Sequence, residues 1–137
     1  MRRGDSYIEI YGLLENEIRD LDDEEKKLFL KEYDISETGL RALINKAYSM
    51  LNLITFYTAG PKETRAWSIM NNSTAPTAAG KIHSDFQKGF IRAEIIDYSD
   101  YIELGSEEEA KNKGLIRSEG KDYIVKDGDI VHFRYNV

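Results

Sequence analysis

The sequence has no cysteine, only two prolines and only two histidines among its 137 residues. The absence of cysteine excludes disulfide bonds, thiolate nucleophiles and cysteine-bound metals, and it is compatible with a reducing compartment. No apolar run approaches the roughly 20 residues that a transmembrane helix needs, and residues 1–10 lack the unbroken apolar core of a signal peptide. We therefore expect a soluble, cytoplasmic protein without a membrane partner.

Catalytic motifs are also missing. There is no G-x-x-x-x-G-K-[ST] motif, so the backbone cradle that binds phosphates in P-loop proteins is absent, and the two Gly-Lys pairs lack the remaining residues of that motif. His83 and His132 stand in no metal-ligand spacing, and neither belongs to a recognisable Ser-His-Asp arrangement. We expect no catalytic residue, no nucleotide-binding residue, no metal and no cofactor in this chain.

The charge balance is acidic, with 19 basic and 25 acidic residues and a net charge of −6. Nonspecific binding of polyanions by the whole surface is therefore disfavoured, and we expect no DNA specificity. A local basic region remains possible, because residues 62–92 contain five basic and two acidic residues, an excess of +3. Any nucleic-acid contact would have to use such a local patch.

Residues 1–52 have helical periodicity after an opening SYIEIY, which is either a short strand or a disordered lead. A first amphipathic helix begins near Leu13, and a second begins after Asp22, which with Glu25 resembles an N-terminal cap. The second helix would bury Leu28, Phe29, Leu30 and Tyr33. A third helix starts near Ser36 or Thr38 and carries an apolar stripe of Leu40, Leu43, Ile44, Ala47 and Leu51. These stripes predict partial exposure when a partner is absent.

At Leu53 the hydrophobic period changes from 3.6 to 2, which predicts a hairpin of LITFYTAG and TRAWSIM around Gly60-Pro61. A helix capped by Thr74 runs to Lys88-Gly89 and leads into a strand over residues 90–97. Two final strands, DYIVK and DIVHFRY, would join at a type I′ turn over Asp127-Gly128. This order of elements predicts an α+β domain in which a mixed sheet wraps one helix, the β-grasp (ubiquitin-like) fold.

Three separate motifs resemble one family. They are similar to the C-terminal region of the Obg-like ATPase (YchF) subfamily of translation-factor-related GTP-binding proteins, and their sequences are LITFYTAGPKETRAW, APTAAGKIHSDFQKGFIRAEII and EGKDYIVKDGDIVHFRYNV. Within the second motif, Ala79-x-x-Ile82-His83-Ser84 resembles the helix motif of TGS domains. The resemblance implies connecting helices over residues 1–52 and a β-grasp TGS domain over residues 53–137. It also implies a non-catalytic module that contacts RNA or the ribosome, with a P-loop ATPase/GTPase domain in the same or another chain.

Strand alternation indicates which residues could form the contact surface. In the last strand Val131, Phe133 and Tyr135 share one face, and His132 and Arg134 share the other. In the strand from Phe90, we expect Ile91, Ala93 and Ile95 to point inward and Phe90, Arg92 and Glu94 to point outward. A surface that combines positively charged side chains with aromatic rings is suited to RNA, because the charges attract phosphates and unstacked bases can rest on the rings. The candidate RNA- or partner-binding residues are Tyr57, Lys62, Arg65, Lys81, His83, Lys88, Arg92, His132 and Arg134.

Each candidate also has a purely structural interpretation. Trp67 fits a core position better than a stacking platform, His83 would buttress the end of a helix, and the arginines could pair with Glu94 and other surface acids. Three hypotheses follow for the function: an RNA- or ribosome-contacting TGS module, a protein-docking module, and a stand-alone enzyme. The missing motifs disfavour the enzyme.

Overall fold

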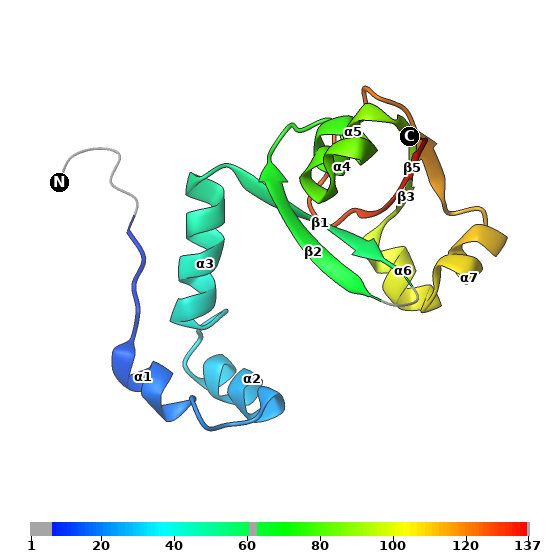
Figure 1. The fold of residues 1–137 in the computed structure, drawn as a ribbon. Coiled ribbons are helices and arrows are strands. Elements are labelled where there is room, and N and C mark those ends of the chain that lie inside the picture. The colour runs from blue at the N-terminus through cyan, green and yellow to red at the C-terminus, as the bar shows by residue number, and fades with distance from the viewer. Residues whose placement is uncertain (1–6, 61–62, 137) are drawn as a thin grey trace. The chain divides into compact units, whose positions relative to one another are not determined.

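A computed structural model of the chain describes residues 7–60 and 63–136 (Figure 1). The chain divides into two compact units, with the division between Met50 and Leu51. The first unit is helical, and the second contains the sheet. No helix within the described ranges has the length and apolar character that crossing a bilayer requires.

The described part of the first unit, residues 7–50, contains three short helices: α1 (Gly12–Glu17), α2 (Asp23–Glu32) and α3 (Gly39–Met50). The predicted cap of the second helix is confirmed, because the Asp22 carboxylate accepts hydrogen bonds from the N–H groups of Glu24 and Glu25, both at 2.9 Å. The Glu25 carboxylate accepts the N–H of Asp22 at 3.0 Å, which completes a capping box. Residues 7–11 form neither helix nor strand.

The apolar side chains of this unit are largely exposed. The predicted burial along the second helix is wrong at Leu28, which is 70% exposed, and at Tyr33, which is 55% exposed, whereas Phe29 and Leu30 are partly buried. Phe29 and Tyr33 instead pack on each other, with ring centroids 4.9 Å apart. Along α3, the partial exposure that the sequence predicts is observed at Leu40, Leu43 and Ile44.

The second unit is built on a five-stranded mixed sheet. Its strands are β1 (Leu53–Ala59), β2 (Thr64–Met70), β3 (Phe90–Ile96), β4 (Arg117–Glu119) and β5 (Ile130–Tyr135). The strand order is β2-β1-β5-β3-β4; β1 and β5 are parallel, and the other neighbouring pairs are antiparallel. The predicted hairpin is confirmed, because β1 pairs with β2 along its whole length, from Leu53 opposite Met70 to Ala59 opposite Thr64.

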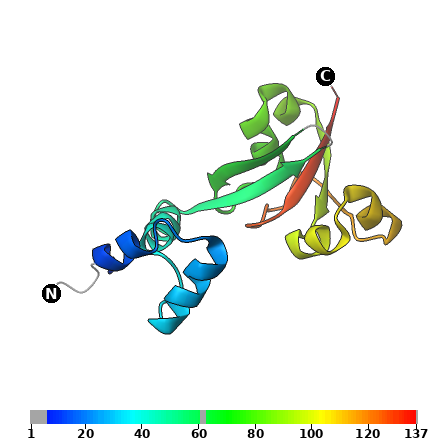
Figure 2. The same cartoon turned by 90° about the horizontal axis from the view of Figure 1, so that it is seen from below.

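Two pairs of helices lie on opposite sides of this sheet (Figure 2). On one side, α4 (Ala75–Ile82) and α5 (Ser84–Lys88) cover the main core, in which Phe56, Ala78 and Ala79 are completely buried. The small alanine side chains let the helix approach the sheet closely, and burial of Phe56 contributes about 1.5–3 kcal/mol. On the other side, α6 (Tyr98–Leu104) and α7 (Glu107–Asn112) cover a smaller cluster around Ile96, Ala110 and Ile130.

The expected continuous helix over residues 74–88 is wrong, because the chain breaks at His83. His83 has an extended backbone (φ −157°, ψ 143°), and its Nδ1 accepts the N–H of Asp85 at 3.2 Å, which caps α5. The second helix then folds back so that Gln87 fills the space beside Gly80, where any larger side chain would collide with it. Thr74 makes no side-chain hydrogen bond to the first turn; its hydroxyl lies 3.0 Å from that of Thr77.

The predicted hairpin of DYIVK and DIVHFRY is also wrong in its first strand. The N–H of Val125 donates to Ser73 and the carbonyl of Tyr123 accepts the N–H of Ala75, so this segment hydrogen-bonds to the start of α4. The fourth strand is Arg117–Glu119 instead. A type I′ turn would need a positive φ at both Asp127 and Gly128, and only Gly128 has one, at 86°.

A β-bulge changes the alternation along β3. The register of β3 against β5 shifts between Phe90 and Arg92. As a result, Phe90 is buried and Ile91 is 53% exposed, which is the reverse of the sequence prediction at these two positions. From Arg92 onward the predicted alternation is correct: Ala93 and Ile95 are completely buried, and Arg92 is exposed.

Candidate functional site

The structure separates the candidate residues into two groups on different sides of the sheet. Arg92, His132 and Arg134 lie together on the side of α6 and α7, with Arg92 opposite Arg134 in the β3–β5 pairing. On the other side, Arg65 on β2, Lys81 on α4, Lys88 on α5 and His83 between the two helices are exposed. Two candidates join neither group. Lys62 lies outside the described residues, and Tyr57 packs against the small cluster under α6 and α7, with its ring centroid 6.2 Å from that of Tyr98.

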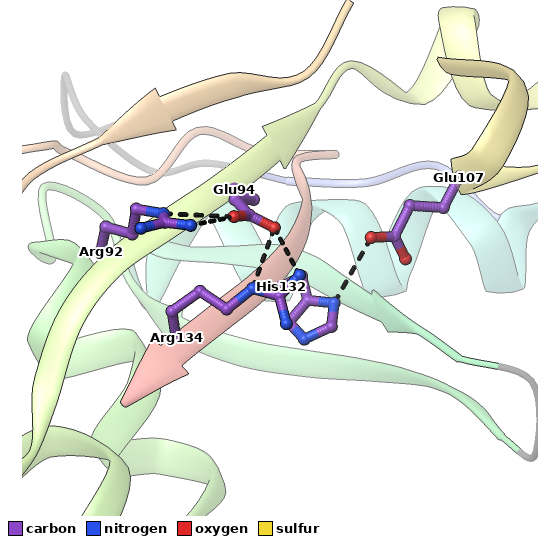
Figure 3. A network of polar contacts seen from close by, with 5 residues as sticks. All are labelled: Arg92, Glu94, Glu107, His132 and Arg134. Atoms are coloured by element: carbon purple, nitrogen blue, oxygen red, sulfur yellow. Dashed lines mark hydrogen bonds and ion pairs between the residues drawn. The ribbon is translucent and has the colours of Figure 1, made fainter. Parts of the chain in front are cut away.

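Glu94 connects the two arginines of the first group (Figure 3). Its Oε1 accepts hydrogen bonds from Arg92 Nη2 at 2.9 Å and Nε at 3.2 Å. Its Oε2 accepts from Arg134 Nη2 at 2.9 Å and Nε at 3.0 Å. Both guanidinium groups thus bind one carboxylate through two nitrogens each, an arrangement that fixes their orientation. We call Arg92, Glu94 and Arg134 the arginine bridge.

The exposure of the bridge differs between its centre and its ends. The Glu94 side chain is only 15% exposed, whereas those of Arg92 and Arg134 are 50% and 45% exposed. The hydrogen bond from Arg134 lowers the pKa of Glu94 most; partial burial opposes this shift and the hydrogen bond from Arg92 adds to it. Glu94 is therefore ionised at neutral pH, and the three residues together carry a charge of only +1. The structural alternative for the arginines, pairing with Glu94, is confirmed.

Glu107, in the first turn of α7, contacts His132 beside the arginine bridge (Figure 3). Its Oε1 lies 3.5 Å from His132 Nδ1, and His132 stands opposite Glu94 in the strand pairing. Glu94, Glu107 and His132 each offer one possible metal ligand, and these atoms lie within 4.8 Å of one another. However, both oxygens of Glu94 already accept hydrogen bonds from guanidinium groups, and two adjacent positive charges oppose cation binding. We therefore assign these side chains to polar contacts with one another and with the two arginines.

The arginines and His132 are visible in the strand alternation, but two members of the network are not. The sequence indicates Glu94 only as a possible partner of a surface arginine, because the convergence of both arginines on it depends on the pairing of β3 with β5. Glu107 belongs to an acidic run that looks like solvated surface. Its proximity to His132 depends on how α7 packs on the sheet, and no local pattern encodes this contact.

On the other side of the sheet, the candidates make mainly local contacts. The Arg65 guanidinium pairs with Glu63 at 3.0 Å and lies over the Trp67 ring, 5.1 Å from its centroid. Trp67 packs against the main core, as the sequence predicts, and its Nε1–H donates to Thr58 Oγ1 at 3.0 Å. His83 terminates α4 and caps α5, which matches its structural interpretation.

Residues 53–136 match the family model YchF-GTPase_C, whose description is "Protein of unknown function (DUF933)". A ribosome-binding ATPase YchF from Haemophilus influenzae is 52% identical over 136 residues, which are 99% of this chain and 38% of that protein. The protein of the same name from Bacillus subtilis is 49% identical over 130 residues, 95% of this chain and 36% of its own length.

A solved structure gives the same result. The YchF GTPase of Schizosaccharomyces pombe superposes with a TM-score of 0.77 at 34% identity, covering 96% of this chain and 34% of that chain. The present chain thus spans well under half the length of the relatives that it matches. The family match over most of the second unit, with about half the residues identical in full-length relatives, shows that this chain belongs to the YchF family and corresponds to its C-terminal region.

Proposed function

We propose that residues 53–137 form a TGS domain with the β-grasp fold, joined to connecting helices over residues 1–52, and that this domain contacts ribosomal RNA without catalysing a reaction. The mixed sheet with α4 and α5 against one face supports the fold assignment. The names of the relatives, ribosome-binding ATPases, support the ribosome as partner.

The observation that carries the RNA contact is the arginine bridge. Arg92 and Arg134 stand side by side across two strands, and each remains about half exposed. A guanidinium has five N–H donors, so each arginine keeps donors for a phosphate while two of its nitrogens bind Glu94. Glu94 thereby holds both groups in place before RNA binds, which lowers the entropic cost of binding.

Nucleotide binding and hydrolysis, in this proposal, belong to a P-loop domain of the same or another chain in the cytoplasm. The 137 residues contain no P-loop motif to bind the phosphates of ATP or GTP. Equilibrium dialysis of the purified chain with radiolabelled ATP and GTP should therefore show no saturable binding. Saturable binding with turnover would refute this part of the proposal.

The RNA contact is tested by fluorescence anisotropy with labelled ribosomal RNA over a range of salt concentrations. The affinity should fall steeply with salt, and Arg92→Ala and Arg134→Ala should each reduce the slope of log K against log[salt] by about 0.7–0.9. Lys121→Ala, an exposed lysine outside the candidate set, is the matched control and should leave the slope unchanged. Equal slopes for the unchanged protein and the three variants would exclude the arginine bridge as the RNA contact.

A further inference from the structure

Among the described residues, one edge of β5 lacks a strand partner along most of its length. β1 and β5 pair only where Tyr57 stands opposite Ile130, although β1 continues to Ala59 and β5 to Tyr135. At this point the N–H of Tyr57 donates to the carbonyl of Asp129 at 2.8 Å. Backbone groups alternate between the two edges of a strand, so the N–H and C=O of Phe133 also point towards β1. Within residues 7–60 and 63–136, no strand pairs with β5 on this side beyond Ile130.

A groove follows this free edge. It has a volume of about 430 Å³, within the range of about 300–1,000 Å³ that is typical of ligand sites. The end of the β1–β2 hairpin forms one wall, β5 forms the other, and α4 and α5 contribute apolar side chains between them. Representative lining residues are Thr58, Trp67, Ile82, Phe86, Phe133 and Tyr135. We call this feature the edge groove.

We propose that the edge groove binds an extended, acidic peptide segment of a partner protein, which adds a strand along β5. An unpaired strand edge offers alternating donors and acceptors that a second peptide backbone matches, as in other cases of β-strand addition. The alternate side chains of the added strand then fall on the apolar lining at Ile82 and Phe86. The interaction is independent of the RNA contact, because Arg92 and Arg134 lie on the opposite side of the sheet.

Charge complementarity favours an acidic over a basic peptide. The hairpin and helix segments that wall the groove, residues 63–88, carry three basic residues (Arg65, Lys81 and Lys88) against two acidic residues (Glu63 and Asp85), an excess of +1 in a chain of net charge −6. Arg65 and Glu63 both line the groove and pair at 3.0 Å, and the exposed guanidinium of Arg65 keeps further N–H donors that can meet a carboxylate at the rim. A basic peptide would meet unfavourable charge along the same walls.

RNA is also anionic, but the rings in the groove favour a peptide. The Arg65 guanidinium already lies over the Trp67 ring, and Phe86 stacks on Tyr135 with centroids 3.8 Å apart and planes at 25°. One face of each of these rings is thus occupied, which leaves less aromatic surface for stacked bases. The unpaired backbone edge, in contrast, is open to another polypeptide.

The test uses Trp67, the single tryptophan of the chain, as a fluorescent reporter in the groove wall. The probe is a peptide of four Val-Glu repeats, which should change the Trp67 emission saturably and shift the Phe133 amide resonance. A peptide of four Val-Lys repeats should bind about tenfold more weakly or less. Two further Val-Glu peptides carry N-methyl groups on the valine or on the glutamate amides. At least one should lose about tenfold in affinity, because methylation removes its backbone donors on one edge.

Two variants complete the experiment. Arg65→Glu should weaken binding of the Val-Glu peptide by about tenfold, whereas Arg92→Ala, on the opposite side of the sheet, should leave it unchanged. Circular dichroism and thermal unfolding verify that both variants are folded. The proposal is overturned if the Val-Glu peptide leaves Trp67 and Phe133 unaffected, or if both N-methylated peptides bind as tightly as the parent. It is also overturned if oligouridylate alone occupies the groove, since the site would then bind RNA.

Discussion

Replacing Glu94 with glutamine tests the central electrostatic feature of the sheet. Glu94→Gln keeps the size of the side chain but removes the charge that Arg92 and Arg134 share. Both arginines are about half exposed, so each ion pair contributes ~0.5–1 kcal/mol instead of the larger value of a buried pair. In the variant, two like charges also face each other directly across β3 and β5. We expect the free energy of unfolding at pH 7 to fall by about 1–2 kcal/mol.

The pH dependence of this loss gives a sharper test. The pKa of Glu94 is lowered in the folded protein, mainly by Arg134, so its charge stabilises the fold above the unfolded pKa of about 4.3. This contribution is lost as the pH falls through the lower, folded pKa. Urea unfolding of both proteins should therefore show a difference at pH 7 that shrinks towards pH 3.

A charge-matched control separates this effect from a general change in net charge. Glu108→Gln removes an exposed carboxylate of α7 and should change stability by less than about 0.5 kcal/mol. The reasoning is refuted if Glu94→Gln behaves like this control at pH 7. It is equally refuted if the loss at pH 3 is as large as at pH 7, because the effect would then come from packing.

Further predictions concern the close approach of Gly89 to the backbone of Asn136 and the hydrogen bond of Tyr123 to the buried Asp129. Gly89→Ala should destabilise the second unit by about 2–4 kcal/mol in urea unfolding, because a Cβ there would overlap the backbone carbonyl of Asn136. Gly120→Ala, with no atom near its Cβ position, is the control, and equal stability of the two variants would contradict the assignment. Burial, followed by the hydrogen bond to Asp129, raises the pKa of Tyr123 to about 12, so an ultraviolet titration of the wild type should contain a late phase that Tyr123→Phe removes. Tyr123→Phe also removes the hydrogen bond that the Tyr123 hydroxyl donates to Asp129, a side chain in a residue that is only 3% exposed. The free energy of unfolding of this variant should therefore fall by about 1–2 kcal/mol. An unchanged titration curve would show that the late phase belongs to another tyrosine.

Features that depend on neighbouring residues were predictable from the sequence. The β1–β2 hairpin follows from period-2 alternation on either side of a short connection, and its strands need no distant partner to find their register. The Asp22 cap involves residues three positions apart. The outward orientation of His132 and Arg134 follows from alternation along one strand, since the side chains of successive residues point to opposite faces.

Predictions failed where a distant contact competed with the local pattern. DYIVK has the composition of a strand, but Val125 hydrogen-bonds to Ser73, about fifty residues earlier in the chain. The helix over residues 74–88 breaks at His83, where the ring bonds to Asp85, and the following turn packs its Gln87 beside Gly80. The bulge at Phe90 arises from the register against β5, which the sequence of β3 does not encode by itself.

The sequence by itself determined the class of the domain, the positions of most strands and the absence of a P-loop, because periodicity and motifs are properties of adjacent residues. Only the tertiary structure decided that one glutamate holds both arginines and that, in the part of the chain that the structure describes, one edge of β5 stays unpaired beside a groove. These features depend on pairing between strands that are far apart in the chain, and a single strand does not specify what its neighbours leave open.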